Sequence, residues 1–187
     1  MNFFSKSPLL FFALLLSTTL AFQACNDNNN RRPTGPDFST VPESYDLSNA
    51  DTTYTKEGGV EIYVIEKGDC PGGIEEYCTV TSRDQIGLKY TGRIFEGGSG
   101  DGEIFESTYA DSNTSSALIS NLTPNSTSQQ SAQIEGFRRG LLGMKQNEKR
   151  VIIVPPSLGY NDNRPGVNGM DLRDETLRYD VELTGIQ

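Results

Sequence analysis

The stretch from Ile134 to Tyr160, IEGFRRGLLGMKQNEKRVIIVPPSLGY, constrains the fold more than any other part of the chain. Four apolar residues in it recur at spacings of three, four and three, which predicts a short amphipathic helix with one apolar stripe. The four are Ile134, Phe137, Leu141 and Met144. Arg138, Arg139 and Lys145 fall outside the stripe and are expected to lie in water. Because the stripe must be buried, the pattern predicts a sheet beneath the helix.

Three glycines in this segment indicate that the helix backbone lies close to a neighbour. Gly136, Gly140 and Gly143 would each cost roughly 1 kcal/mol relative to alanine in an isolated helix. A core helix of poor propensity is the alternative interpretation. The apolar run at 151–154 is continuous and β-branched, which predicts a buried strand. Pro155 and Pro156 end its ladder because neither can donate a backbone N–H.

Three other stretches alternate between apolar and polar residues with a period of two. They read VEIYVIEKG from residue 60, QIGLKYTGRI from residue 85 and TLRYDVELTGI from residue 176. Such alternation predicts an antiparallel sheet with one covered face and one solvated face, the latter carrying Arg93, Arg178 and Asp180. A further strand is expected in ALISNL, with Leu118 and Leu122 facing inward. Strands covered by a single helix indicate an α+β domain.

The chain contains no histidine, and this excludes several kinds of catalyst. Ser-His-Asp and Cys-His arrangements both need an imidazole base. The glycines of EGGSGDG lie between predicted strands rather than before a helix, so they do not resemble a phosphate-binding loop. A net charge of −9 makes nucleic acid an unsuitable partner. We therefore expect no cofactor, no metal and no nucleic acid.

The N-terminal part of the chain is expected to direct export. In residues 1–24, one early Lys6 precedes the apolar run PLLFFALLLSTTLAF, which is shorter than the roughly 20 residues that a membrane-spanning helix needs. The sequence FQAC, which ends at Cys25, resembles a bacterial lipoprotein signal in which the cysteine becomes lipidated; ordinary secretion is the alternative. Residues 25–54 are polar and aperiodic, which predicts a disordered tether before a folded domain at 55–187.

The same segment predicts where the protein resides. A lipidated Cys25 would anchor the domain to a membrane of the cell envelope, facing the periplasm, and Asn26 after the cysteine favours the outer membrane. The tether carries no heptad pattern, so we expect a monomer. Cys70 and Cys78 then remain as an even pair around PGGIEEY, which predicts a disulfide that closes a loop. A metal site is the rival interpretation, although two cysteines without histidine do not make a usual zinc site.

Several segments together resemble FKBP-type peptidyl-prolyl cis/trans isomerases. GLLGMKQNEKRVIIVPPSLGY is similar to the family's GLxGMKxGEKRxxxIPPxLAYG. IGLKYTGRIFEGG followed by GEIFEST resembles VxVHYTGxLxDGxxFDSS, and ETLRYDVELTGI resembles ATLxFxVELLxI. The resemblance covers about residues 58 to 187, in the right order. It implies an FKBP-like fold, a twisted antiparallel β-sheet wrapped around one short α-helix, and isomerisation of X-Pro bonds in unfolded or proline-containing exported polypeptides.

The resemblance also implies a pocket between helix and sheet. Seven residues of this chain stand at the motif positions that form the pocket in the family: Tyr90, Phe105, Glu106, Ile134, Phe137, Tyr160 and Tyr179. In the family, the backbone N–H at the place of Ile134 and the hydroxyl at the place of Tyr160 hold substrate carbonyls, while the others form floor and walls.

Three departures from the family pattern keep a second hypothesis open. Phe137 stands where the family usually has tryptophan, and Glu106 stands where it usually has aspartate. The flap NDNRPGVNGMDLRDE is longer and lacks the family's IPPN, so its apolar contact could fall on Met170 or on Leu172. These features motivate the alternative of a non-catalytic proline-peptide-binding module, or a holdase chaperone, on the same fold.

Overall fold

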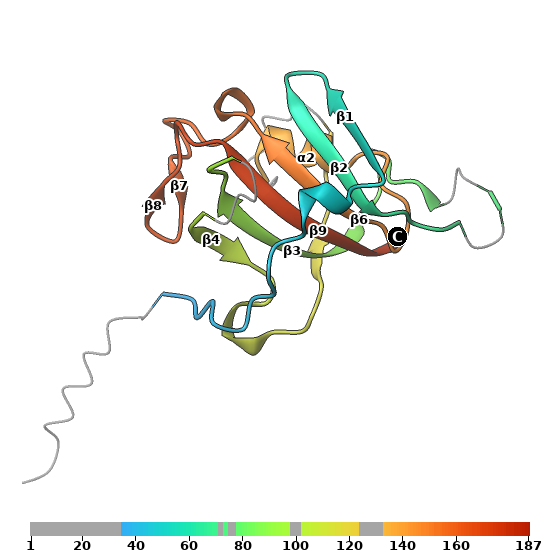
Figure 1. The fold of residues 1–187 in the computed structure, drawn as a ribbon, viewed down its shortest axis with the longest axis horizontal. Helices are drawn as coiled ribbons and strands as arrows, with labels where there is room; N and C mark the ends of the chain where they lie inside the picture. Colours follow the sequence, from blue (N-terminus) through green and yellow to red (C-terminus); the bar gives the residue numbers. More distant parts are fainter. Residues whose placement is uncertain (1–34, 71–72, 75–77, 98–101, 124–132) are drawn as a thin grey trace, which may run out of the picture. The chain divides into compact units, whose positions relative to one another are not determined.

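The computed structural model describes residues 35–187 except 71–72, 75–77, 98–101 and 124–132. Its main element is a seven-stranded sheet in which all paired strands are antiparallel, as the alternating residues predict (Figure 1). The strands are β1 (Thr52–Lys56), β2 (Val60–Glu66), β3 (Ile86–Ile94), β4 (Ile104–Ser107), β5 (Ala117–Ile119), β6 (Lys149–Val154) and β9 (Leu177–Ile186). The order across the sheet is β1-β2-β6-β9-β3-β4, and β5 also pairs with β3.

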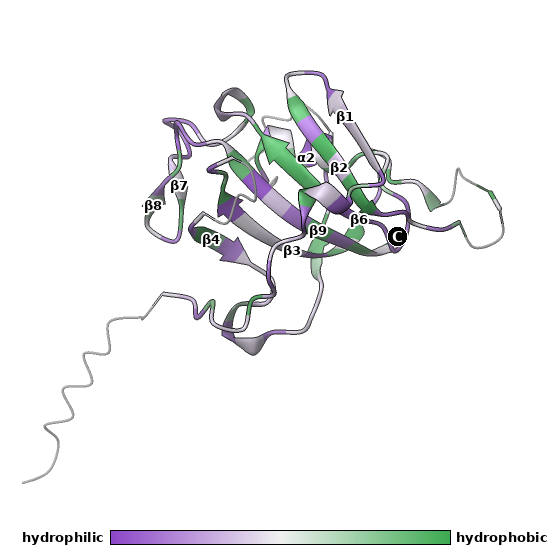
Figure 2. Ribbon diagram, viewed as in Figure 1, coloured by the Kyte–Doolittle hydropathy of each residue, from purple (hydrophilic) through white to green (hydrophobic). Residues whose placement is uncertain are grey.

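The helix α2 (Glu135–Leu141) packs on the inner face of this sheet, against β2 and β6. Its close approach confirms the interpretation of two of the three glycines. A Cβ at Gly136 would lie 2.2 Å from Val154 Cγ1, and one at Gly140 would lie 2.4 Å from Ile152 Cγ2. Gly143 has a different role, because its φ of +76° turns the chain just after the helix. Figure 2 shows the hydrophobic residues of β2 and β6 in green.

Two cations hold the C-terminal end of α2 in place. Arg150 Nη1 donates to the Gly140 carbonyl at 2.6 Å, and Lys56 Nζ donates to the Leu142 carbonyl at 2.5 Å. Positive charge is favourable at the end of a helix where carbonyl groups lack intrahelical partners. Arg150 is also paired with Glu148 at 2.6 Å, so its buried charge is compensated. Lys56 of β1 and Arg150 of β6 thereby position the helix over the sheet.

Part of the outer face of the sheet, over β3 and β9, is covered by residues 35–51, which we call the N-terminal strap. Arg93 Nη2 donates to the Pro42 carbonyl at 2.8 Å, and Arg178 Nη2 donates to the Tyr45 carbonyl. In return, the Tyr45 N–H donates to Asp180 Oδ1 at 3.1 Å. The expectation of a solvated face is therefore wrong here. Arg93, Arg178 and Asp180 are only 8%, 0% and 8% exposed, because the strap excludes water from them.

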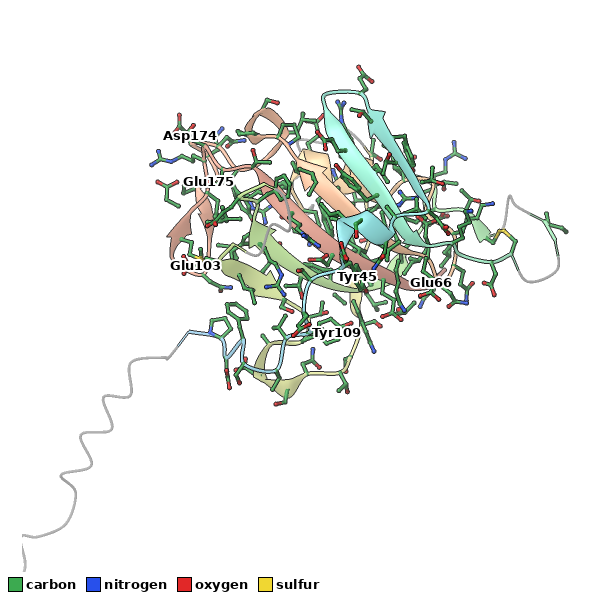
Figure 3. The ribbon with its side chains drawn as sticks, viewed as in Figure 1. Tyr45, Glu66, Glu103, Tyr109, Asp174 and Glu175 are labelled. Carbon is green, nitrogen blue, oxygen red and sulfur yellow. A yellow bond between two sulfur atoms is a disulfide. The ribbon has the colours of Figure 1, made fainter. Side chains whose placement is uncertain are left out.

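The strap also differs from the expectation of a disordered tether over residues 25–54. The Asp37 N–H donates to Asp111 Oδ1 at 3.0 Å, and the Thr40 hydroxyl donates to the Tyr109 carbonyl at 2.9 Å. The 3₁₀ turn η1 (Leu47–Asn49) follows, and β1 begins before residue 54. Tyr45 and Tyr109 line one cavity above the sheet (Figure 3). Polar contacts with distant residues order this segment, and these leave no apolar period in the sequence.

Two other side chains lie elsewhere than the sequence predicts. Arg138 is buried, at 4% exposed, because its guanidinium donates to the Gln133 carbonyl at the start of α2. Leu118 is 61% exposed, since β5 is a three-residue edge strand that turns this side chain outward; Leu122 faces inward as expected. Cys70 and Cys78 form the predicted disulfide, with 5.3 Å between their Cα atoms.

The predicted signal and Cys25 lie outside the described residues. Of the helices within the described ranges, none combines the length and apolar character required to cross a bilayer.

Candidate functional site

The seven predicted pocket residues come from five parts of the fold and meet beside α2. They are contributed by β3 (Tyr90), β4 (Phe105 and Glu106), the N-cap and body of α2 (Ile134 and Phe137), the loop after the 3₁₀ turn η3, Pro156–Leu158 (Tyr160), and β9 (Tyr179). Strands β3 and β9 are neighbours, and β4 lies next to β3, so the sheet brings distant segments of the chain together.

Five aromatic rings form the body of this cluster. Phe137 stacks on Tyr179, with ring centroids 4.2 Å apart and planes inclined by 29°. Phe105 meets Tyr179 edge to face at 5.6 Å and meets Tyr160 in the same way at 6.2 Å. The Tyr90 ring lies 5.3 Å from that of Phe137. Stacked and edge-to-face pairs at these distances are the favourable geometries for aromatic rings.

The cluster is buried. The five aromatic side chains and Ile134 are each at most 8% exposed, and all six belong to the hydrophobic core. The rings therefore fill the space between helix and sheet with one another.

Glu106 places a carboxyl group at the edge of the aromatic cluster. Burial raises the pKa of Glu106 above its usual range, and the positive charge of Arg164 and the hydroxyls of Tyr179 and Tyr90 act in the opposite direction. Oε1 of this carboxyl is shielded from solvent and has no hydrogen-bond partner. The hydroxyl of Tyr179 is also buried, and it lies near enough to the carboxyl to lower its pKa.

The tyrosine hydroxyls of the cluster stay protonated at neutral pH. Burial raises the pKa of Tyr160 to about 12, helped by the negative charge of Glu106 and opposed by Arg164. Burial likewise raises the pKa of Tyr90 and that of Tyr179, and Glu106 adds to both. All three hydroxyls can therefore donate a hydrogen bond.

The flap above the cluster is held by contacts that the sequence motifs do not reveal. It contains the two-stranded ribbon of β7 (Gly166–Val167) and β8 (Met170–Asp171). Asn168 Nδ2 donates to the Phe105 carbonyl at 2.8 Å, which fixes the ribbon to β4. Leu172 is fully buried in the core, whereas Met170 is half-buried and packs against it. Both candidates for the apolar contact thus face the core.

The residues of this cluster suit shape recognition rather than metal chemistry. Among the described residues, no three His, Cys, Asp or Glu side chains are placed to hold a metal ion. The Ile134 N–H, at the N-cap of α2, donates to none of the described residues and is available to donate a hydrogen bond to a carbonyl oxygen. The site thus combines aromatic walls with a few hydrogen-bond donors.

Comparison with known proteins places this arrangement in a family. Residues 77–184 match the family model described as FKBP-type peptidyl-prolyl cis-trans isomerase. Peptidyl-prolyl cis-trans isomerase FKBP10 of Homo sapiens is 36% identical over 129 residues, which are 69% of this chain and 19% of that protein. FK506-binding protein 2 of Dictyostelium discoideum is 31% identical over 111 residues, 58% of this chain and 71% of that protein. The chain thus spans only about a fifth of the human relative.

Solved structures show the same fold. FkpA from Escherichia coli aligns with a TM-score of 0.53 at 22% identity, covering 75% of this chain and 54% of that one. The N-terminal domain of FKBP42 from Arabidopsis thaliana aligns with a TM-score of 0.51 at 17% identity, covering 79% of this chain and 98% of that one. Since the family model spans more than half of the sequence and the fold agrees, the chain belongs to the FKBP-type peptidyl-prolyl cis-trans isomerase family.

Proposed function

We propose that this protein catalyses cis/trans isomerisation of X-Pro bonds in unfolded or partly folded exported polypeptides. The observation that carries the proposal is the cluster of five aromatic rings around Phe137, at the positions the family uses for its substrate pocket. The activity is that of the family to which the chain belongs.

The proposed mechanism needs no proton transfer. Amide resonance holds an X-Pro bond planar with a barrier of roughly 18 to 20 kcal/mol, and the resonance is lost as the bond twists. The twisted amide is less charge-separated than the planar one, so a dry aromatic pocket disfavours the planar form relative to the twisted form. Phe137, Tyr179 and Phe105 supply such walls. Catalysis then follows from binding the twisted form more tightly.

Two donors would hold the substrate in the twisted geometry. The Ile134 N–H and the Tyr160 hydroxyl are the groups proposed to bind substrate carbonyls, and both lie at the edge of the aromatic cluster. Glu106 Oε1 offers an acceptor beside them.

The test is the isomerisation rate of a Leu-Pro peptide with the purified full-length chain. We expect turnover that an FKBP-pocket macrolide blocks. Tyr160→Phe, which removes only a hydroxyl, should lower kcat/KM about fivefold, as expected for one neutral hydrogen bond. Tyr54→Phe is the matched control, because Tyr54 is an exposed tyrosine of β1 far from the cluster in the strand order. Equal loss in both variants would contradict the assigned role of Tyr160.

A binding module or holdase is the second candidate. Phe137 in place of tryptophan and Glu106 in place of aspartate favour it over turnover. A proline peptide would then bind, and the protein would suppress aggregation of an unfolded client, without any rate enhancement. Titration of the peptide against the aromatic fluorescence, run beside the rate assay, separates the two candidates.

We further propose that residues 1–24 are a lipoprotein signal and that Cys25 carries the lipid, anchoring a monomer to the cell envelope with its domain facing the periplasm. The proposal is supported by the sequence FQAC and by the polar segment that follows. Labelling with a radioactive fatty acid should mark the wild-type protein and fail to mark Cys25→Ser. Membrane fractionation then identifies the membrane, and light scattering of the solubilised protein reports the oligomeric state.

A further inference from the structure

Arg164 occupies a distinctive place above the aromatic cluster. A tight turn follows Tyr160, in which the Asn161 N–H donates to the Arg164 carbonyl and the Arg164 N–H donates to the Asn161 carbonyl, both at 2.9 Å. This turn points the guanidinium back over Tyr160, 5.3 Å from the ring centroid. An arginine stacked on an aromatic face is held in position while the N–H donors at its edge remain available.

The positive charge of Arg164 has no paired carboxylate within the described parts of the chain. Its guanidinium forms no hydrogen bond and no ion pair with any described residue. Arg173 of the same flap differs, because it is paired with Asp162 at 3.1 Å and with Asp171 at 2.5 Å. Glu106 is close enough to feel the charge of Arg164, yet the two make no direct ion pair. An unpaired, half-buried guanidinium thus lies beside the hydroxyl proposed to hold a substrate carbonyl.

We propose that Arg164 is a specificity residue that favours substrates with a carboxylate, from Asp or Glu, adjacent to the proline. The inference rests on the proposed function, since it concerns the segment bound at the Tyr160 hydroxyl. A guanidinium has five N–H donors in a fork that matches a carboxylate, and a contact of this kind forms two parallel hydrogen bonds. A peptide whose carbonyl reaches Tyr160 places its neighbouring side chain near Arg164.

Other acidic groups oppose this preference at longer range. Glu103, Asp174 and Glu175 lie toward the flap side of the molecule (Figure 3), and Glu106 is near enough for Arg164 to lower its pKa. At physiological ionic strength, charges more than about 8 Å apart are largely screened, whereas a direct contact with Arg164 is not. The local contact therefore decides between an acidic and a neutral side chain.

The experiment compares isomerisation of otherwise identical peptides in 0.15 M salt, with a direct assay that needs no protease. Glu, Gln or Lys precedes the proline in three of the peptides, and Glu follows the proline in a fourth. The fourth peptide shows on which side of the proline a carboxylate contacts Arg164. For the purified full-length chain we expect kcat/KM about fivefold higher for Glu than for Gln, as for a half-exposed ion pair, with the difference in KM. Arg164→Gln should bring the ratio to about one, and Arg164→Glu should favour Lys.

The ratio of kcat/KM for the Glu peptide to that for the Gln peptide separates a change in specificity from a folding defect, because a folding defect lowers the rates with all peptides equally. Arg173→Gln is the matched control and should leave the Glu to Gln ratio unchanged. A ratio near one in the wild type, or a ratio that survives in Arg164→Gln, overturns the inference. If no peptide is turned over, the proposed catalysis fails, and the ratio of dissociation constants for the same peptides decides the inference separately.

Discussion

The buried charges beneath the N-terminal strap allow a quantitative test of the fold. Asp180 accepts hydrogen bonds from Arg178 Nη2 at 2.8 Å and from the Tyr45 N–H, and its other oxygen lies 3.7 Å from Arg93 Nε. Asp180→Asn would leave two guanidinium groups buried without a negative partner. Breaking a buried ion pair by removing one partner costs about 3 to 5 kcal/mol, so we expect the free energy of unfolding to fall by that amount.

The expected cost of Asp180→Asn is large because the strap keeps these charges buried. Deleting residues 35–45 removes the carbonyls of Pro42 and Tyr45 and opens Arg93 and Arg178 to water. In the deleted chain the same Asp180→Asn substitution affects only a solvated pair, which costs at most about 1 kcal/mol. The two changes should therefore be coupled by about 2 to 4 kcal/mol.

The assay is urea unfolding of four proteins: the wild type, each single variant and the double variant. Asp171→Asn is the control, because Asp171 is exposed and pairs with an exposed Arg173; it should change stability by less than about 1 kcal/mol. Near-UV circular dichroism shows whether the shortened chain keeps its packed core. If Asp180→Asn costs the same with and without the strap, the strap does not bury these charges and the reasoning is refuted.

Three further perturbations test other parts of the structure. Gly136→Ala would place a methyl group 2.2 Å from Val154 Cγ1, so thermal melts should show a loss of about 1 to 3 kcal/mol by overpacking, where a free helix would gain stability. Burial raises the pKa of Glu106, so its ionised form disfavours the folded state; Glu106→Gln should be more stabilising at pH 7 than below the usual carboxyl pKa of 4.5, and the opposite trend in urea melts would refute this. Reducing the disulfide between Cys70 and Cys78 should cost about 2.5 kcal/mol, measured as unfolding with and without reductant, and no change would show that the loop is not constrained by it.

Local periodicity predicts much of the fold. Alternation in the last strand separates Tyr179, which faces the helix, from Arg178 and Asp180, which face away from it. The same alternation cannot show that the outward face is buried. The strap that covers it lies more than a hundred residues earlier, and it binds through its backbone carbonyls, for which any side chain would serve.

The candidate site was predictable where the family motifs apply and not where they end. The motif positions brought Phe105, Phe137 and Tyr179 into one cluster, although their packing as a closed core depends on the whole fold. The contacts of Arg164 and Asn168 were not predicted because the flap departs from the family pattern. The signal for Arg164 was a turn-forming sequence, NDNR, directly after Tyr160, since such a turn returns its fourth residue toward the first.

The strap also bears on how the domain responds to a pulling force. Tension applied ahead of Gly35 would load its contacts one after another, first those of Asp37 with Asp111 and later those of Tyr45 with Arg178. Contacts that break in sequence yield at lower force than contacts that are sheared together. The strap would therefore peel from the outer face and lengthen the chain before tension reached β1, while the aromatic rings on the inner face stayed packed. Unfolding of the strap would therefore protect the packing of the aromatic cluster from tension applied at the N-terminal end.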